Sequence, residues 1–203
     1  MGVPLKDLRD EATGTMTQLP VNPKYLNLLK EFGADENPHS NATLLDHLVG
    51  TYSLLANWGN EESVSVGGLF HSIYGTQSYK IQSADLACRP AIANVIGNEA
   101  ELLAYLFCVC DRRSFYAEIG KDKPMLWNCV SDHFEPSAPK LVRALVEIEA
   151  ANIVEQTDAA VPIPRASLSI IRQAYARTEP YLSRGGSAAF GHLLERLVVA
   201  KHA

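Results

Sequence analysis

Residues 43–59 read TLLDHLVGTYSLLANWG, and their apolar side chains recur with the period of an α-helix. The stripe that these side chains form along one helix face, at spacings of four and three residues, consists of Leu44, Leu48, Tyr52 and Leu55. We expect the helix to begin near Ser40 and to run to about Trp58, because Gly59 is a residue type that commonly ends helices.

Helical patterns continue on both sides of this stretch, and strand signals are almost absent. Asn22 and Pro23 form a typical helix start, and Gly33 ends that first helix. Further helices are predicted over 60–71, 90–97, 98–110, 139–156, 164–178 and 187–201. Residues 76–88 and 112–136 are predicted to be loop or irregular. The sequence therefore predicts an all-α fold with seven to nine helices around one core.

The composition is that of an ordinary globular protein. The chain has 203 residues, 47% of them hydrophobic and 20% charged, with a formal net charge of −5. We expect a loose arm over residues 1–20 and a single domain over 21–203. The N-terminal residues lack the apolar stretch of a secretory signal, and no run of 18 apolar residues predicts a membrane span. The acidic balance argues against general nucleic-acid binding.

The four cysteines do not form a metal-binding pattern. Cys108 and Cys110 lie in an apolar run, where buried free thiols are common. A single C-x-C pair is a weak zinc signal. We therefore expect inert core thiols and a reducing, cytoplasmic location.

Two of the six histidines face small residues one helical turn away. Gly50 follows His47 by three positions, and Gly67 and Gly68 precede His71 by four and three. Small neighbours leave room for a ligand beside the imidazoles. They also allow two helices to approach closely around a pair of hydrogen-bonded core histidines. The spacing alone leaves both interpretations open.

The two histidine segments together resemble the first two motifs of the HD-domain superfamily. The segment DHLVGTYSLLANWG at 46–59 is followed by VGGLFHS at 66–72, with 24 residues from His47 to His71. The hydrolase domain of the (p)ppGpp synthetase/hydrolase family is similar, including IGNEAELL at 96–103. This resemblance covers residues 38–156. The chain also resembles a family of uncharacterised proteins with a DUF6817-type domain.

The HD resemblance implies a metal held by two histidines and two aspartates. His47 and His71 match the histidines, but Ser72 stands where the pattern has aspartate. Asn152 is the best match for the distant aspartate, and Asp111 is its rival. Two further residues are candidates for the same pocket: His39 and Tyr74. The acidic pair that serves hydrolysis in that family would fall near residues 75–76, which are not acidic.

The resemblance implies a metal-dependent hydrolase that acts on a small phosphorylated or nucleotide-like molecule. Imidazole and oxygen donors suit Mn²⁺, Fe²⁺ or Zn²⁺. Basic residues of the irregular segment would face an anionic ligand if this segment covers the pocket: Arg112, Arg113, Lys121 and Lys123. Alternatives are a non-catalytic HD fold that binds a small ligand or a partner, and an HD-type iron oxygenase. The sequence assigns no catalytic residue and leaves a homo-oligomer open.

Overall fold

A computed structural model describes residues 19–39, 42–77, 79–157 and 163–199. The expected arm over residues 1–20 lies outside these ranges, apart from its last two residues. The described residues form nine α-helices, two short 3₁₀ turns and two small antiparallel hairpins. About 65% of the described residues are helical, so the prediction of a helical fold is confirmed. The fold is not purely all-α, because it contains two small hairpins that were not predicted.

The elements follow one another along the chain in this order: α1 (Pro23–Glu31), β1 (Pro38–His39), β2 (Ala42–Thr43), α2 (Leu44–Asn57), α3 (Glu62–Leu69), η1 (Leu86–Cys88), α4 (Arg89–Ile96), α5 (Asn98–Val109), α6 (Arg112–Glu118), β3 (Met125–Asn128), β4 (His133–Pro136), α7 (Pro139–Gln156), α8 (Arg165–Thr178), η2 (Glu179–Tyr181) and α9 (Arg184–Val199). None of the described helices is long and apolar enough to cross a membrane.

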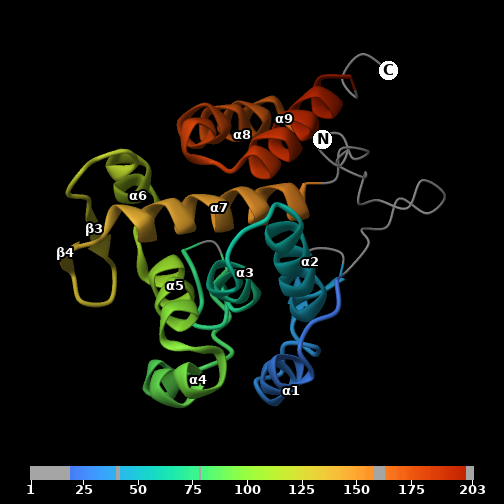
Figure 1. The fold of residues 1–203 in the computed structure, drawn as a ribbon. Coiled ribbons are helices and arrows are strands. Elements are labelled where there is room, and N and C mark those ends of the chain that lie inside the picture. Colours follow the sequence, from blue (N-terminus) through green and yellow to red (C-terminus); the bar gives the residue numbers. More distant parts are fainter. Residues whose placement is uncertain (1–18, 40–41, 78, 158–162, 200–203) are drawn as a thin grey trace.

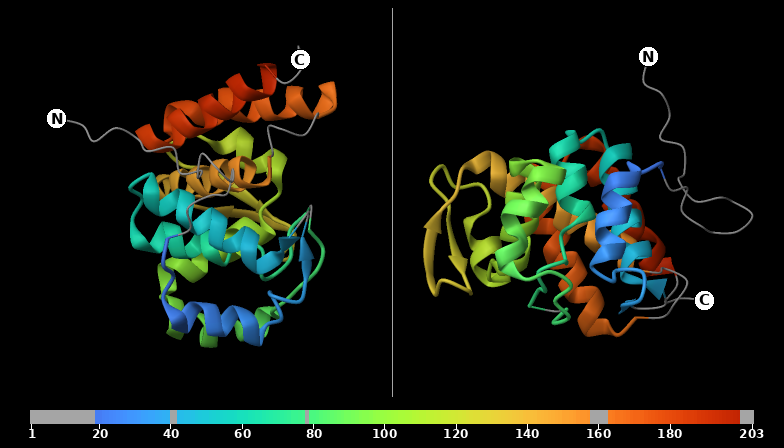
Figure 2. Two further views of the ribbon diagram at one scale, coloured as in Figure 1. Left: turned by 90° about the vertical axis from the view of Figure 1, so that its right-hand side faces the viewer. Right: turned by 90° about the horizontal axis from the view of Figure 1, so that it is seen from below.

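Helix α7 runs through the middle of the molecule. Helices α8 and α9 lie on one side of it, and α2, α3 and α5 lie on the other (Figure 1). Helices α1 and α4 cover the end farthest from α8 and α9, as the views in Figure 2 also show. Two apolar cores result, one around α7 and the other between α1 and α5. Helix α7 is therefore the central helix of the fold, with buried side chains packed around it.

Helix α2 starts later than expected because a capping box fixes its first turn. The hydroxyl of Thr43 accepts from the backbone N–H of Asp46, and the carboxylate of Asp46 accepts from the backbone N–H of Thr43. This reciprocal arrangement satisfies two donors that a helix N-terminus would otherwise leave unpaired. The carboxylate of Asp46 is therefore engaged in capping the N-terminus of α2.

Glycines in α3 let three helices pack closely. A Cβ atom on Gly68 would lie 2.2 Å from Cδ1 of Leu55 in α2, and one on Gly67 would lie 2.9 Å from Cβ of Leu103 in α5. Both contacts are shorter than side chains tolerate, so larger residues would push the helices apart. Helix α3 ends at Leu69, and His71 therefore lies in the turn that follows rather than on the helix.

The segment 112–136 is ordered rather than irregular, which corrects the prediction for it. Asp111 caps the short helix α6, and β3 pairs with β4 so that Trp127 lies opposite Phe134. The segment 76–88 is mostly loop, as expected, with η1 at its end. The helix predicted from residue 60 begins at Glu62, with Glu61 as its N-cap, so Asn60 lies before it. The Asn60 side chain instead donates to Glu147 of α7.

Candidate functional site

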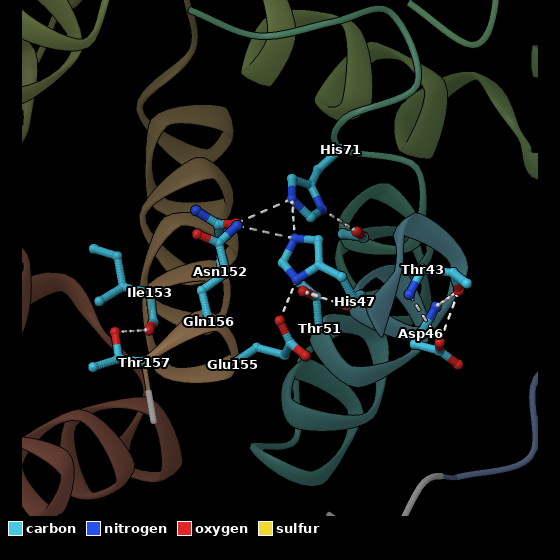
Figure 3. A network of polar contacts seen from close by, with 11 residues as sticks. Thr43, Asp46, His47, Thr51, His71, Asn152, Ile153, Glu155, Gln156 and Thr157 are labelled. Atoms are coloured by element: carbon cyan, nitrogen blue, oxygen red, sulfur yellow. Dashed lines mark hydrogen bonds and ion pairs between the residues drawn. The ribbon is translucent and has the colours of Figure 1, made fainter. Parts of the chain in front are cut away.

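The imidazoles of His47 and His71 meet in the interior of the protein. Their Nε2 atoms lie 3.1 Å apart, and their rings cross nearly at right angles with centroids 5.0 Å apart (Figure 3). Only 3% of His47 and 1% of His71 is exposed. His47 projects from the first half of α2, and His71 comes from the turn after α3. The spacing of 24 residues thus brings the two side chains together.

Helix α7 supplies a third polar group to this pair. Oδ1 of Asn152 lies 3.2 Å from Nε2 of His71. The side-chain amide of Gln156, one turn further along α7, donates to Oδ1 of Asn152 at 3.0 Å and lies 3.4 Å from Nε2 of His47. All three residues proposed from the sequence as metal ligands, His47, His71 and Asn152, therefore lie in one cluster. Gln156 joins them without having been predicted.

Contacts at the far side of each ring decide which nitrogen carries the proton. Nδ1 of His71 lies 2.6 Å from the backbone carbonyl of Gly68, which can only accept a hydrogen bond. Nδ1 of His47 contacts the carboxylate of Glu155. Both Nδ1 atoms therefore carry hydrogen, so Nε2 of either ring presents a lone pair whenever that ring is neutral. Oδ1 of Asn152 is a further acceptor beside Nε2 of His71.

Burial keeps His71 uncharged. The pKa of His71 is held well below its usual value, first by loss of solvation and then by the charge of His47. The positive charge of Arg112 acts in the same direction, against the hydrogen bonds to Gly68 and Asn152. His71 is therefore a neutral imidazole at physiological pH, which is the form that can bind a metal.

Glu155, like Gln156, is a site residue that was not predicted from the sequence. It reaches His47 because residue 50 has no side chain: a Cβ atom there would lie 2.8 Å from Cγ of Glu155. Two features carry this signal in the sequence. Gly50 lies one turn from His47, and Glu155 lies three residues after Asn152 on the same predicted helix. Neither feature identifies the other without the packing of α2 against α7.

The other candidate residues make contacts elsewhere. Ser72 is buried directly after His71. The hydroxyl of Tyr74 donates to Glu101 at 3.0 Å, and burial and that carboxylate raise its pKa. Asp111 accepts from the backbone of Ser114 at the start of α6 and from the side chain of Gln77. The side chain of His39 lies outside the part of the chain that the structure describes.

The chemistry of the cluster is that of a neutral donor set. Among the described residues, no three His, Cys, Asp or Glu side chains are grouped to hold a metal ion, and the third donor beside His47 and His71 is an amide. Ligands bound about 2.1 Å from one ion lie roughly 3.0–3.4 Å from each other. The separations of 3.1 and 3.2 Å that connect the three atoms fall in this range. The residues present thus fit a divalent ion of the kind that imidazole prefers.

Comparison with known proteins gives one match. Residues 28–112 match the sequence model of a family described as "Domain of unknown function (DUF6817)". The matched range includes both histidines and ends before α7, which supplies the other residues of the cluster. No curated protein and no solved structure matches the chain.

Proposed function

We propose that this protein is a metal-dependent hydrolase of the HD type, with the ion held by His47, His71 and Asn152. One observation carries the proposal. The Nε2 atoms of the two histidines lie 3.1 Å apart, and Oδ1 of Asn152 lies 3.2 Å from Nε2 of His71, so that neutral rings with hydrogen on Nδ1 bring three acceptors together. Converging lone pairs repel one another unless a positive charge or a proton lies among them.

Glu155 compensates in part for the missing acidic ligands. Its carboxylate contacts Nδ1 of His47, and a carboxylate in that position orients the imidazole and makes its other nitrogen more basic. The carbonyl of Gly68 does the same for His71 with a neutral acceptor. The negative charge of the site therefore lies on Glu155, which contacts a histidine and would not bind the ion directly.

A divalent ion held by His47, His71 and Asn152 would supply an activated water for hydrolysis. His71 and His47 present their unprotonated Nε2 atoms, and Asn152 adds a neutral oxygen. Gln156 borders the same atoms from the more exposed end of α7. The substrate class that accompanies the HD resemblance is a small phosphorylated or nucleotide-like molecule.

A second candidate is a non-catalytic binding protein in which a proton replaces the ion. The distance of 3.1 Å between the two Nε2 atoms also suits a hydrogen bond. In that state His47 would carry the positive charge opposite Glu155, and it would donate to His71. The same cluster would then hold the helices together and bind no metal.

Metal analysis of the purified protein separates the two candidates. The hydrolase proposal expects about one equivalent of Mn, Fe or Zn, with loss in His47→Gln and His71→Gln. His192→Gln serves as the matched control, because that side chain is 63% exposed and lies on α9. Less than about a tenth of an equivalent, with no rise in melting temperature on adding metal, would leave the proton-bridged pair as the correct description.

Activity assays address the reaction itself. The metal-loaded protein is incubated with a panel of nucleotides and phosphorylated metabolites, and release of phosphate or nucleoside is measured. Hydrolysis that disappears on chelation and in His71→Gln supports the proposal. Bound iron with dioxygen consumption, and no hydrolysis, would assign the site to an iron oxygenase instead.

A further inference from the structure

Arg112, the first residue of α6, is a partly buried cation with unused hydrogen-bond donors. Its side chain is 25% exposed, and Nε lies 3.6 Å from Oε2 of Glu149, which is too long for a hydrogen bond. Among the residues that the structure describes, the guanidinium donates no hydrogen bond. A guanidinium offers five N–H groups in a rigid fork, so this is a large unused capacity.

A second arginine of the protein, Arg89, forms a doubly hydrogen-bonded ion pair and serves as a comparison. Arg89 donates to both oxygens of Glu101 at 2.6 and 2.9 Å. The acid beside Arg112 differs, because Oε1 of Glu149 accepts from the hydroxyl of Tyr116 and Oε2 is buried without a hydrogen-bond partner. Arg112 is thus held near its counter-charge without being saturated by it.

The position of Arg112 connects it with the histidine cluster. Its guanidinium stacks over the ring of Phe107 at 3.9 Å, and the ring of Phe107 packs edge-on against His71 with centroids 4.9 Å apart. Glu149 lies on α7 one turn before Asn152. A single aromatic ring therefore separates the free donors of Arg112 from the proposed metal ligands.

We propose that Arg112 binds an oxyanion group of the molecule that occupies this site. The inference rests on the proposed function and adds the residue that would bind the phosphate-like anion of its substrate. Stacking on Phe107 fixes the plane of the guanidinium, and planar paired donors match two oxygens of a phosphate. Glu149 is buried and lies beside Arg112 as its counter-charge.

Binding of inorganic pyrophosphate tests this assignment. Titration calorimetry is carried out on the full chain, as purified and after addition of Mn²⁺, with wild type, Arg112→Gln and Arg113→Gln. Arg113 is the matched control, since it is exposed, adjacent and of equal charge. We expect Arg112→Gln to weaken pyrophosphate binding by about tenfold or more, whereas Arg113→Gln should stay within about twofold. Arg112→Lys keeps the charge but not the fork, and should fall between them.

The outcomes separate this inference from the proposed function. Equal losses in Arg112→Gln and Arg113→Gln, or no binding by wild type at millimolar pyrophosphate, would overturn the inference. Loss of metal in His71→Gln together with such a result would leave the metal site standing alone. Pyrophosphate binding that depends on Arg112 in a protein that holds no metal would instead support an anion site without hydrolysis. Melting temperatures of all variants show that each is folded.

Discussion

Glu155 contacts Nδ1 of His47 across 108 positions of the chain, through a space that exists because residue 50 is glycine. The contact joins α7 to α2 beside the histidine pair (Figure 3). Among the described residues, Glu155 provides the only carboxylate of this cluster. Its removal is therefore the most direct way to test how the site obtains negative charge.

We predict that Glu155→Gln weakens metal binding without abolishing it. The amide keeps the shape of the side chain but no longer stabilises positive charge on His47. Nε2 of His47 therefore becomes a weaker ligand for a metal ion. Changes of this kind typically cost about 10–100-fold in metal affinity. Calorimetric titration with Mn²⁺ and Zn²⁺ measures the effect. Unchanged affinity would show that Glu155 has only a packing role.

Gly50→Ala should reproduce the loss of metal affinity through packing. The new methyl group would displace Glu155, because its Cβ would lie 2.8 Å from Cγ and 3.0 Å from Oε1 of that residue. Stability should change little, since alanine favours the helix by about 1 kcal/mol and offsets part of the crowding. The Gly50→Ala, Glu155→Gln double variant should bind metal no more weakly than either single variant. Additive losses would contradict the shared mechanism.

Gly68→Ala should destabilise the protein, because its Cβ would lie 2.2 Å from Cδ1 of the fully buried Leu55. Crowding of this kind costs about 1–3 kcal/mol. Urea unfolding measures this change, and Leu55→Ala provides the second half of a double-mutant cycle. The double variant should lose less stability than the sum of the single losses, since each change relieves the other. A strictly additive result would show that Gly68 is not in tight contact with Leu55.

The cap of α6 predicts a pH-dependent loss of stability. Hydrogen bonds from the backbone of Ser114 and from Gln77 hold the pKa of Asp111 below its usual value. A lowered folded-state pKa means that this stabilisation is complete well above the unfolded value of about 3.9 and is lost as the pH falls through the folded value. Asp111→Ala should therefore cost about 1 kcal/mol at pH 7 and much less near pH 3. Asp122→Ala, an exposed acid, should differ little from wild type at either pH.

Thiol reactivity should distinguish the cysteines. Burial raises the pKa of Cys108 and of Cys110 to about 12, so neither thiolate forms at ordinary pH. Cys129 is exposed and should react first with a thiol reagent at pH 8. Mass spectrometry after brief labelling of the native protein identifies the modified residues. Early labelling of Cys108 would indicate that the region around His71 opens readily, because the Cys108 thiol donates to the His71 carbonyl at 3.1 Å.

Periodicity in the sequence was sufficient for the long helices. Helix α7 has the predicted ends, Pro139 and Gln156, because a proline starts it and its apolar positions continue for five turns. The hairpin of β3 and β4 was missed, since each strand has only four residues and its sequence shows no clear alternation of apolar and polar residues. Helix α6 depends on the cap at Asp111 rather than on an apolar stripe.

The site was predictable only where spacing along the chain corresponds to contact. His47 and His71 belong to neighbouring elements, so their separation of 24 residues could be interpreted from the sequence. Asn152 was reached through a resemblance, and Glu155 and Gln156 were not reached at all. Glu155 and Gln156 contact His47 only because α7 packs against α2. No local sequence pattern contains this tertiary information.

The central place of α7 has a consequence for the order of folding. The two histidines can approach each other as soon as α2 and α3 pair, but the contacts to Asn152 and Glu155 span 81 and 108 positions. Closing such long loops is entropically costly and is expected late. A ligand that needs all of these groups would therefore slow unfolding more than it speeds folding. Its effect would be seen in the lifetime of the native state.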